Sequence, residues 1–259
     1  MSSWFDPYPR TATSNYTGLK PRGPQRLILG PWTHGDRSNT VFGDVDFGGG
    51  ALGTAQNFDG FFARFDGAGT HLFSRSFGGT GNQAASALKP ISGGILVAGT
   101  FEQTTVFGNA GDPTTTSAGA TDGFLALYDS LNELVWSTPF GGTGSEGIAG
   151  SVSMDADFGS GRAYVAGTTT STGFSIGSTM MPTGTTGYLA QVNPAGTITW
   201  AKGFNTGTYP VYVASSTLGP YVATTVQASV DMGGGPLAAF GGNDIVVAHF
   251  DSNGTYLWS

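Results

Sequence analysis

Apolar and polar positions of this chain alternate in short runs separated by turn residues. In the stretch TDGFLALYDSLNELVWSTPFGGTG (121–144), the apolar residues Phe124, Ala126 and Tyr128 lie two positions apart, and an Asp/Asn turn follows. Leu134 and Trp136 then resume the apolar spacing. Two such runs around a short polar turn predict a β-hairpin.

The same hairpin pattern occurs four times, about sixty residues apart, so the chain contains an internal repeat. The aligned segments are FDGFFARFDGAGTHLFSRSFGGTG (58–81), 121–144, TTGYLAQVNPAGTITWAKGFNTGT (185–208) and GNDIVVAHFDSNGTYLWS (242–259). One aromatic position marks the register, at Phe73, Trp136, Trp200 and Trp258. Because large apolar side chains dominate burial, we expect these aromatics to pack between neighbouring repeats rather than to stack on a ligand.

Further strands are predicted downstream of each hairpin. GGILVAGTF (93–101) and GRAYVAGTT (161–169) predict a third strand, and 104–111 and 172–178 a fourth. In the third copy, GPYVATTVQASVDMGGG (219–235) takes this place with altered spacing. Four strands per repeat are typical of a propeller blade.

The predicted fold class is therefore all-β, a β-propeller-like array of four-stranded blades with about three blades and a partial fourth. A short non-propeller segment, 1–50, precedes the blades, which occupy 51–259. The predicted blades are 52–117, 118–184, 185–240 and the partial 241–259. An array with open strand edges invites pairing with another chain, which predicts a homo-oligomer formed through those edges.

The repeat resembles the bacterial seven-bladed β-propeller (SBBP) family over about 52–259. The shared features are a D-x-F/Y strand, a W-S before a GG-T/S-G turn, and a V-A/T-G strand, as in DGFLALYD, WSTPFGGTG and AYVAGTT. Phe73, Asn205 and Thr206 depart from this pattern. The resemblance implies an extracellular or cell-surface location and a noncatalytic binding or structural module, with a protein or carbohydrate partner. A fragment or fusion product of a larger protein is the expected origin.

The front segment SSWFDPYPRTATSNYTGLKPRGPQRLILGPWTHGDRSNTVFGDVDFG (2–49) resembles the end of the catalytic domain of the X-prolyl dipeptidyl-peptidase and cocaine-esterase type of α/β-hydrolase. That resemblance gives Asp6 the role of triad acid and His34 that of triad base. In such enzymes the nucleophilic serine comes first, so we expect both residues to be vestigial. The alternative function is a serine-hydrolase remnant, an esterase or X-Pro peptidase.

The stretch 26–47 follows the order of 94–111, an apolar strand, a polar turn and T-V-F-G. One hypothesis is that it adds two strands to the blade begun at 242–259. The alternative is a loosely packed tail.

Charge and composition exclude some classes of binding partner. Residues 50–259 carry five Lys or Arg against thirteen Asp or Glu, and the whole chain has a net charge of −7. An acidic surface repels phosphate backbones and anionic membranes, so we expect no nucleic-acid binding and no membrane insertion. No cysteine is present, no apolar signal segment is visible, and no cofactor is expected.

Three further sequence patterns are weaker indications of a catalytic or binding site. GFSIG (173–177) places Ser175 in a G-x-S-x-G motif, but no helical pattern follows to form a nucleophile elbow. Asp155 and Asp157 have the spacing of a calcium loop without its distal Glu, which favours a surface turn. The two GGTG segments lack the GK[ST] ending of a phosphate loop, so we expect inter-strand turns there.

Overall fold

The computed structural model describes residues 2–3, 29–30, 57–147 and 152–259. The chain divides into two compact units, 1–56 and 57–259, whereas the sequence predicted a boundary after residue 50. In the first unit, strands β1 (Ser2–Ser3) and β2 (Leu29–Gly30) pair in parallel. The rest of the segment hypothesised to join the last blade, 26–47, lies outside the described residues.

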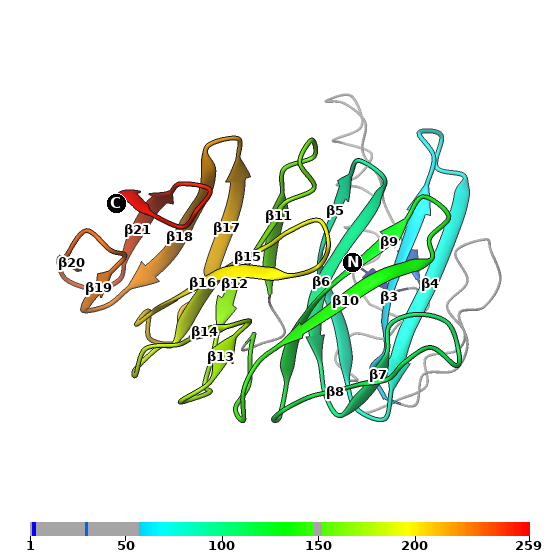
Figure 1. The fold of residues 1–259 in the computed structure, drawn as a ribbon, viewed down its shortest axis with the longest axis horizontal. Helices are drawn as coiled ribbons and strands as arrows, with labels where there is room; N and C mark the ends of the chain where they lie inside the picture. Colours follow the sequence, from blue (N-terminus) through cyan, green and yellow to red (C-terminus); the bar gives the residue numbers. More distant parts are fainter. Residues whose placement is uncertain (1, 4–28, 31–56, 148–151) are drawn as a thin grey trace. The chain divides into compact units, whose positions relative to one another are not determined.

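The second unit is all-β, as predicted, and no described residue is helical. The described residues form four four-stranded antiparallel sheets that follow one another along the chain, and we call the last three blades 1 to 3 (Figure 1). Blade 1 consists of β5 (Gln83–Ile91), β6 (Gly94–Phe101), β9 (Asp122–Asp129) and β10 (Leu134–Phe140). Blade 2 consists of β11 (Ser153–Ala156), β12 (Ala163–Thr168), β15 (Gly187–Val192) and β16 (Ile198–Phe204). Blade 3 consists of β17 (Val211–Ser216), β18 (Gly219–Val226), β21 (Asp244–Phe250) and β22 (Tyr256–Trp258).

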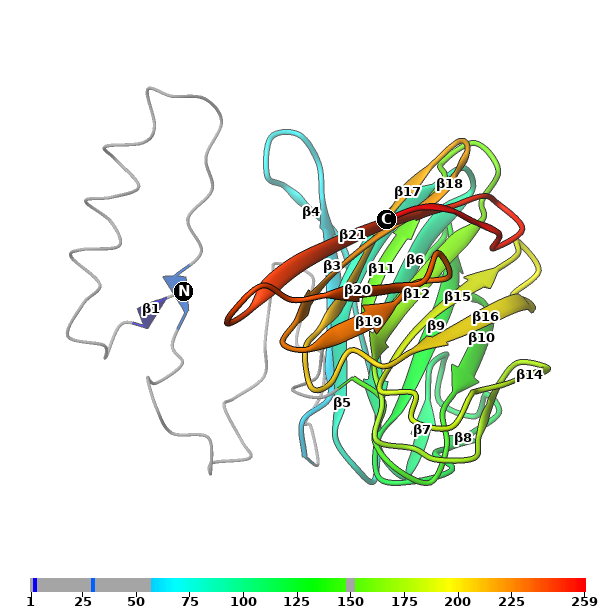
Figure 2. The ribbon, with the colours of Figure 1, turned by 90° about the vertical axis from the view of Figure 1, so that its left-hand side faces the viewer.

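A hairpin, β3 (Gly60–Phe65) and β4 (His71–Gly79), precedes blade 1 at one end of this array, and blade 3 lies at the opposite end (Figure 1). The strands of blade 3 are tilted relative to those of the hairpin (Figure 2). The partial blade therefore lies at the start of the array. The prediction that 241–259 begins a fourth blade was wrong, because β21 pairs with β18 along its length and completes blade 3.

The predicted blade boundaries are shifted by half a repeat. The repeated hairpin closes each sheet rather than opening it, since β6 pairs with β9 from Gly94↔Asp129 to Phe101↔Asp122. The sheets thus cross the predicted boundaries at 117/118 and 184/185. In a tandem repeat, the strand pattern is the same whichever hairpin is taken first, so the sequence pattern alone does not distinguish the two phases.

The predicted fourth strands also lie elsewhere. Within 104–111, β7 (Thr104–Val106) pairs with the end of β4 and with β8 (Thr115–Thr116). Within 172–178, β13 (Ser175–Ile176) forms a small hairpin with β14 (Thr179–Met180), and the third blade has the corresponding pair β19 (Ser229–Asp231) and β20 (Pro236–Ala238). The true first strand of each blade, β5, β11 or β17, was not predicted.

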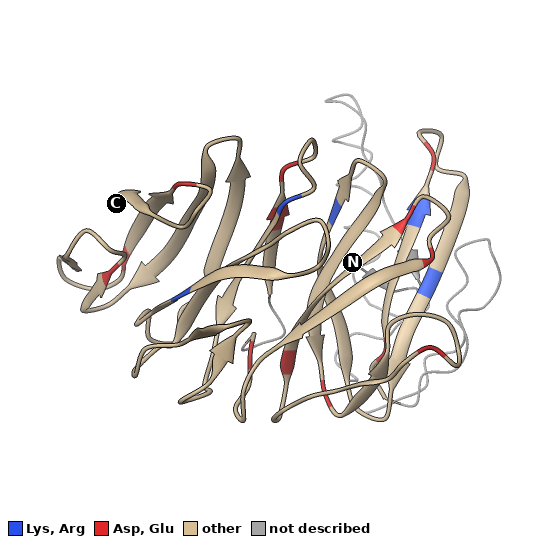
Figure 3. Ribbon diagram, viewed as in Figure 1, with Lys and Arg blue, Asp and Glu red and all other residues tan. Residues whose placement is uncertain are grey.

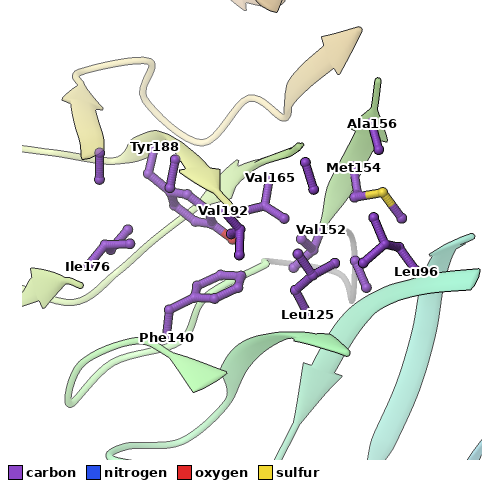
Figure 4. Close-up of a cluster of buried hydrophobic side chains, with 14 of the residues drawn as sticks. Leu96, Leu125, Phe140, Val152, Met154, Ala156, Val165, Ile176, Tyr188 and Val192 are labelled. Carbon is purple, nitrogen blue, oxygen red and sulfur yellow. The ribbon is translucent and has the colours of Figure 1, made fainter. Parts of the chain in front are cut away.

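The core forms one cluster at each junction between sheets. The cluster between blades 1 and 2 joins Leu96 and Leu125 of blade 1 to Val165 and Tyr188 of blade 2 (Figure 4). Similar clusters join the β3–β4 hairpin to blade 1 and blade 2 to blade 3. Since burying one such side chain contributes about 1.5–3 kcal/mol, each blade is stabilised mainly by its neighbours.

The first strands of successive blades are linked by side chains. The Ser86 hydroxyl donates to the Val152 carbonyl at 2.8 Å, and the Ser215 amide donates to the Asp155 carboxylate at 2.8 Å. Lys89 Nζ lies 2.6 Å from the other carboxylate oxygen of Asp155. Asp155 therefore bridges all three first strands.

Candidate functional site

Each repeated hairpin turns through the same hydrogen-bonded loop. The side-chain Oδ1 of the first turn residue accepts backbone N–H groups from the second and fourth residues after it, at 2.7–3.0 Å. These first residues are Asp66, Asp129, Asn193 and Asp251. Backbone hydrogen bonds, from Thr70 and from Thr255, lower the pKa of Asp66 and Asp251. The turn acidic groups are therefore structural.

The repeated tryptophan of one blade packs on the turn of the next. Trp136 Nε1 donates to the Pro194 carbonyl at 3.0 Å, and its ring lies so close to Gly196 that an added Cβ would sit 2.6 Å from it. Trp200 Nε1 donates to the Ser252 carbonyl at 3.2 Å, and its ring lies over Gly254. Both rings pack against the inter-blade clusters, which confirms the predicted role of these aromatics.

A second donor reaches the same carbonyl from blade 2. Gln191 Nε2 donates to the Ser252 carbonyl at 2.6 Å, beside the indole of Trp200. Two N–H groups of blade 2 thus converge on one turn carbonyl of blade 3.

The first junction uses different residues. Phe73 holds the place of tryptophan, and Asn132, with φ of +66°, holds the place of the turn glycine. Arg75 lies over the rings of Phe73 and Tyr128 and forms an ion pair of 3.2 Å with Glu133. Where no tryptophan sits on the turn, glycine is not needed.

Blade 3 presents an apolar outer face that no described residue covers as the other blades are covered. We call it the terminal face, and it comprises Tyr212, Tyr221, Ile245, Val247, His249 and Trp258. Ile245 is 79% exposed and Trp258 47%. Val247 is 42% exposed, whereas Leu125 and Leu189, its equivalents in register, are fully buried under the next blade.

One group on the terminal face is buried without a partner. The His249 ring stacks on Tyr221 at 4.1 Å with an interplanar angle of 3°, and its Nε2 has no hydrogen-bond partner among the described residues. Residues 211–259 contain no Lys or Arg, and the few charged positions of this blade lie in turns and at strand ends (Figure 3).

A buried carboxyl pair is the strongest chemical cluster that the sequence did not predict. Glu146 accepts hydrogen bonds from the Thr169 hydroxyl at 2.8 Å and the Gly142 amide at 3.0 Å. Burial raises the pKa of Asp122 to about 6, and the Glu146 carboxyl adds to the shift against a hydrogen bond from Ala118. The recurrence of Asp59, Asp122 and Asp244 at one repeat position was the available signal.

The carboxyl at this repeat position has a structural role. Asp122 and Asp244 each accept the backbone N–H of the residue four positions earlier, Ala118 or Phe240. Asp122 lines a surface depression of about 620 Å³ that contains no histidine. A carboxyl at this position therefore fixes the loop that enters the third strand of the blade.

The structure does not bring the candidate catalytic residues of the sequence together in one site. Ser175 lies on the β13–β14 hairpin rather than on a strand-to-helix elbow, and its hydroxyl contacts the Met180 sulfur at 3.8 Å. Asp6 and His34 lie outside the described residues.

The weak calcium candidates have other partners. Burial alone would raise the pKa of Asp155, but hydrogen bonds from Lys89 and Ser215 outweigh it and lower that pKa. Hydrogen bonds from Ser160 and from the Gly159 amide lower the pKa of Asp157. The described part of the chain holds no group of three or more metal-ligating side chains.

Comparison with known proteins gives no relative: no family model matches the chain, and no curated protein matches it. Within the described residues, no helix has the length and apolar character needed to cross a membrane.

Proposed function

We propose that residues 57–259 form a noncatalytic binding and assembly module of the propeller type, whose binding surface is the terminal face. The observation that carries the proposal is the exposure of Val247 at a position where Leu125 and Leu189 are fully buried. A contiguous exposed apolar patch on a protein marks an interaction site. The terminal face carries no lysine or arginine, and such an uncharged apolar surface suits a protein partner. Exposed Tyr and Trp rings can also stack on a sugar, so a carbohydrate is the second ligand class to test.

The resemblance to SBBP repeats supports the same function. Its V-A/T-G segments lie in β6 and β12, and its W-S segment lies in β10, the closing strand of blade 1. By that resemblance the module would work at the cell surface or outside the cell. Fold alone does not determine activity, so the argument for binding rests on the exposed face.

The alternative, a serine-hydrolase remnant, has one supporting observation. The parallel pairing of β1 with β2 joins segments far apart in sequence, and parallel strands need a long crossover connection of the kind found in α/β folds. Hydrolysis of p-nitrophenyl acetate above the buffer rate, lost on His34→Ala, would favour this alternative over the binding module.

A dye-binding experiment tests the terminal face. Bis-ANS is titrated into dilute wild-type protein, into the double variant Ile245→Lys/Val247→Lys, and into the matched control Leu131→Lys, a 76% exposed apolar residue in a turn of blade 1. We expect the double variant to weaken dye binding by about tenfold and the control to leave it unchanged. Equal dye binding by both variants would overturn the proposed function.

A further inference from the structure

The two ends of the array carry the two halves of one blade–blade junction. At the β3–β4 end, Phe61 is 45% exposed, whereas its equivalents Phe124 and Tyr188 are fully buried against the preceding sheet. At the other end, the terminal face exposes the positions that the next blade covers elsewhere. Among the described residues, no blade packs on the outer side of the β3–β4 hairpin and none packs on the terminal face.

The turn of the β3–β4 hairpin has the features that a tryptophan requires. Gly69 has φ of +88°, close to the +81° of Gly196 and the +80° of Gly254, the two glycines that lie under Trp136 and Trp200. No described atom lies within 4 Å of the Cβ position of Gly69. Among the described residues, none occupies the position over Gly69 that corresponds to the indole position over Gly196 and Gly254.

The terminal face supplies a matching exposed donor, Trp258. Trp258 corresponds in register to Trp200, and His249 corresponds to Gln191. In blade 2 those two side chains donate to one turn carbonyl, that of Ser252. The carbonyl in the same position of the first hairpin turn is that of Gly67.

We propose that the partner of the terminal face is a second copy of this chain, joined head to tail. The Trp258 ring of one copy rests on Gly69 of the other, and Trp258 Nε1 donates to the Gly67 carbonyl. This inference rests on the proposed function, because it uses the same face. One chain cannot make the contact with itself in the observed arrangement, since the hairpin and blade 3 lie at opposite ends of the array (Figure 1).

The stoichiometry follows from the blade count. The described part of each chain forms three complete blades and one further four-stranded sheet, which contains the β3–β4 hairpin. Two chains joined at both junctions would therefore have about eight blade positions, within the range of four to eight at which propellers close. A head-to-tail contact that closes gives a ring, so we expect a species of twice the 26.5 kDa chain mass.

The test measures self-association of the full chain by sedimentation velocity over a dilution series. Trp258→Ala removes the donor side. Gly69→Asn blocks the acceptor side with the residue that the chain itself uses at position 132, where φ is also positive. Gly184→Asn, at φ of +83° with nothing within 4 Å, is the matched control. We expect each of the first two variants to raise the dissociation constant by about tenfold or more, and the control to leave it unchanged.

Mixing separates a head-to-tail contact from a symmetric one. The Trp258→Ala chain keeps an intact acceptor and the Gly69→Asn chain an intact donor, so an equimolar mixture should regain one junction and associate more tightly than either alone. Association that is unaffected by Gly69→Asn, or that is not regained on mixing, would overturn the inference.

The two proposals fail in different ways. A wild-type chain that stays single at all concentrations, yet binds bis-ANS at the terminal face, would overturn self-association and leave the binding module standing. Dye binding that is unchanged by Ile245→Lys/Val247→Lys would overturn the proposed binding module itself.

Discussion

The contact between Trp136 and Gly196 gives the sharpest test of how the blades are held together. In Gly196→Ala, the new Cβ would lie 2.6 Å from the indole ring in a backbone with φ of +81°. A left-handed conformation costs an alanine about 1–2 kcal/mol. Forcing a methyl group into a packed site costs about 1–3 kcal/mol more. The free energy of unfolding should therefore fall by about 2–5 kcal/mol.

Gly184→Ala is the matched control, because Gly184 has φ of +83° and no atom within 4 Å of its Cβ position. It should lose only the conformational part, about 1–2 kcal/mol. Urea unfolding followed by circular dichroism measures both variants. In a Trp136→Ala background, the cost of Gly196→Ala should fall to that of the control, which isolates the pairwise contact. Equal losses for Gly196→Ala and Gly184→Ala in the parent chain would refute the packing explanation.

Three further predictions concern the buried carboxyl, the indole hydrogen bond and metal binding. Because burial raises the pKa of Asp122 from its ordinary 3.8 to about 6, the folded state holds this proton more tightly than the unfolded state, and stability should fall as pH rises across that interval, by up to about 3 kcal/mol. Asp122→Asn should flatten this dependence in urea unfolding between pH ~4 and ~8, and an unchanged slope would contradict the assignment. Trp200→Phe removes the hydrogen bond to the Ser252 carbonyl and should cost about 1 kcal/mol of unfolding free energy, whereas an unchanged denaturation midpoint would show that the bond contributes nothing. Since Lys89 occupies the Asp155 carboxylate, neither calcium nor EDTA should shift the melting temperature, and a calcium-dependent rise would restore the calcium-loop interpretation.

The hairpins and their inter-blade tryptophans were predictable because they carry strong signals, a period-two apolar pattern and a large aromatic at a fixed position. The first strand of each blade was not, because β5 is rich in Ala and interrupted by Lys and Pro, β11 is only SMDA, and β17 has just three strongly β-forming residues in VYVASS. Such strands are buried by their neighbours rather than by their own side chains. Residue composition therefore does not predict a strand whose burial depends on its position in the array.

The candidate site was predictable only in part. The repeat register identifies Trp258 and Trp200 as equivalents, but the sequence does not show that one is covered and the other exposed. The Asp122–Glu146 pair joins residues 24 positions apart, through a loop whose path no local pattern specifies. The sequence predicted association through open strand edges, whereas the structure exposes a sheet face.

The side-chain links among the first strands have a consequence for how the array opens. Ser86 and the Lys89–Asp155 ion pair link blade 1 to blade 2, and Asp155 links blade 2 to blade 3. Blades 1 and 3 are therefore connected through Asp155 of blade 2. Stability in such a linear array is close to a sum of nearest-neighbour terms. Blade 2 has a complete blade on both sides, so its amide protons should exchange last. Local unfolding should begin at the β21–β22 hairpin, and the amides of Val246 and Ala248 should therefore lose protection before those of Tyr188 and Ala190, their counterparts in blade 2.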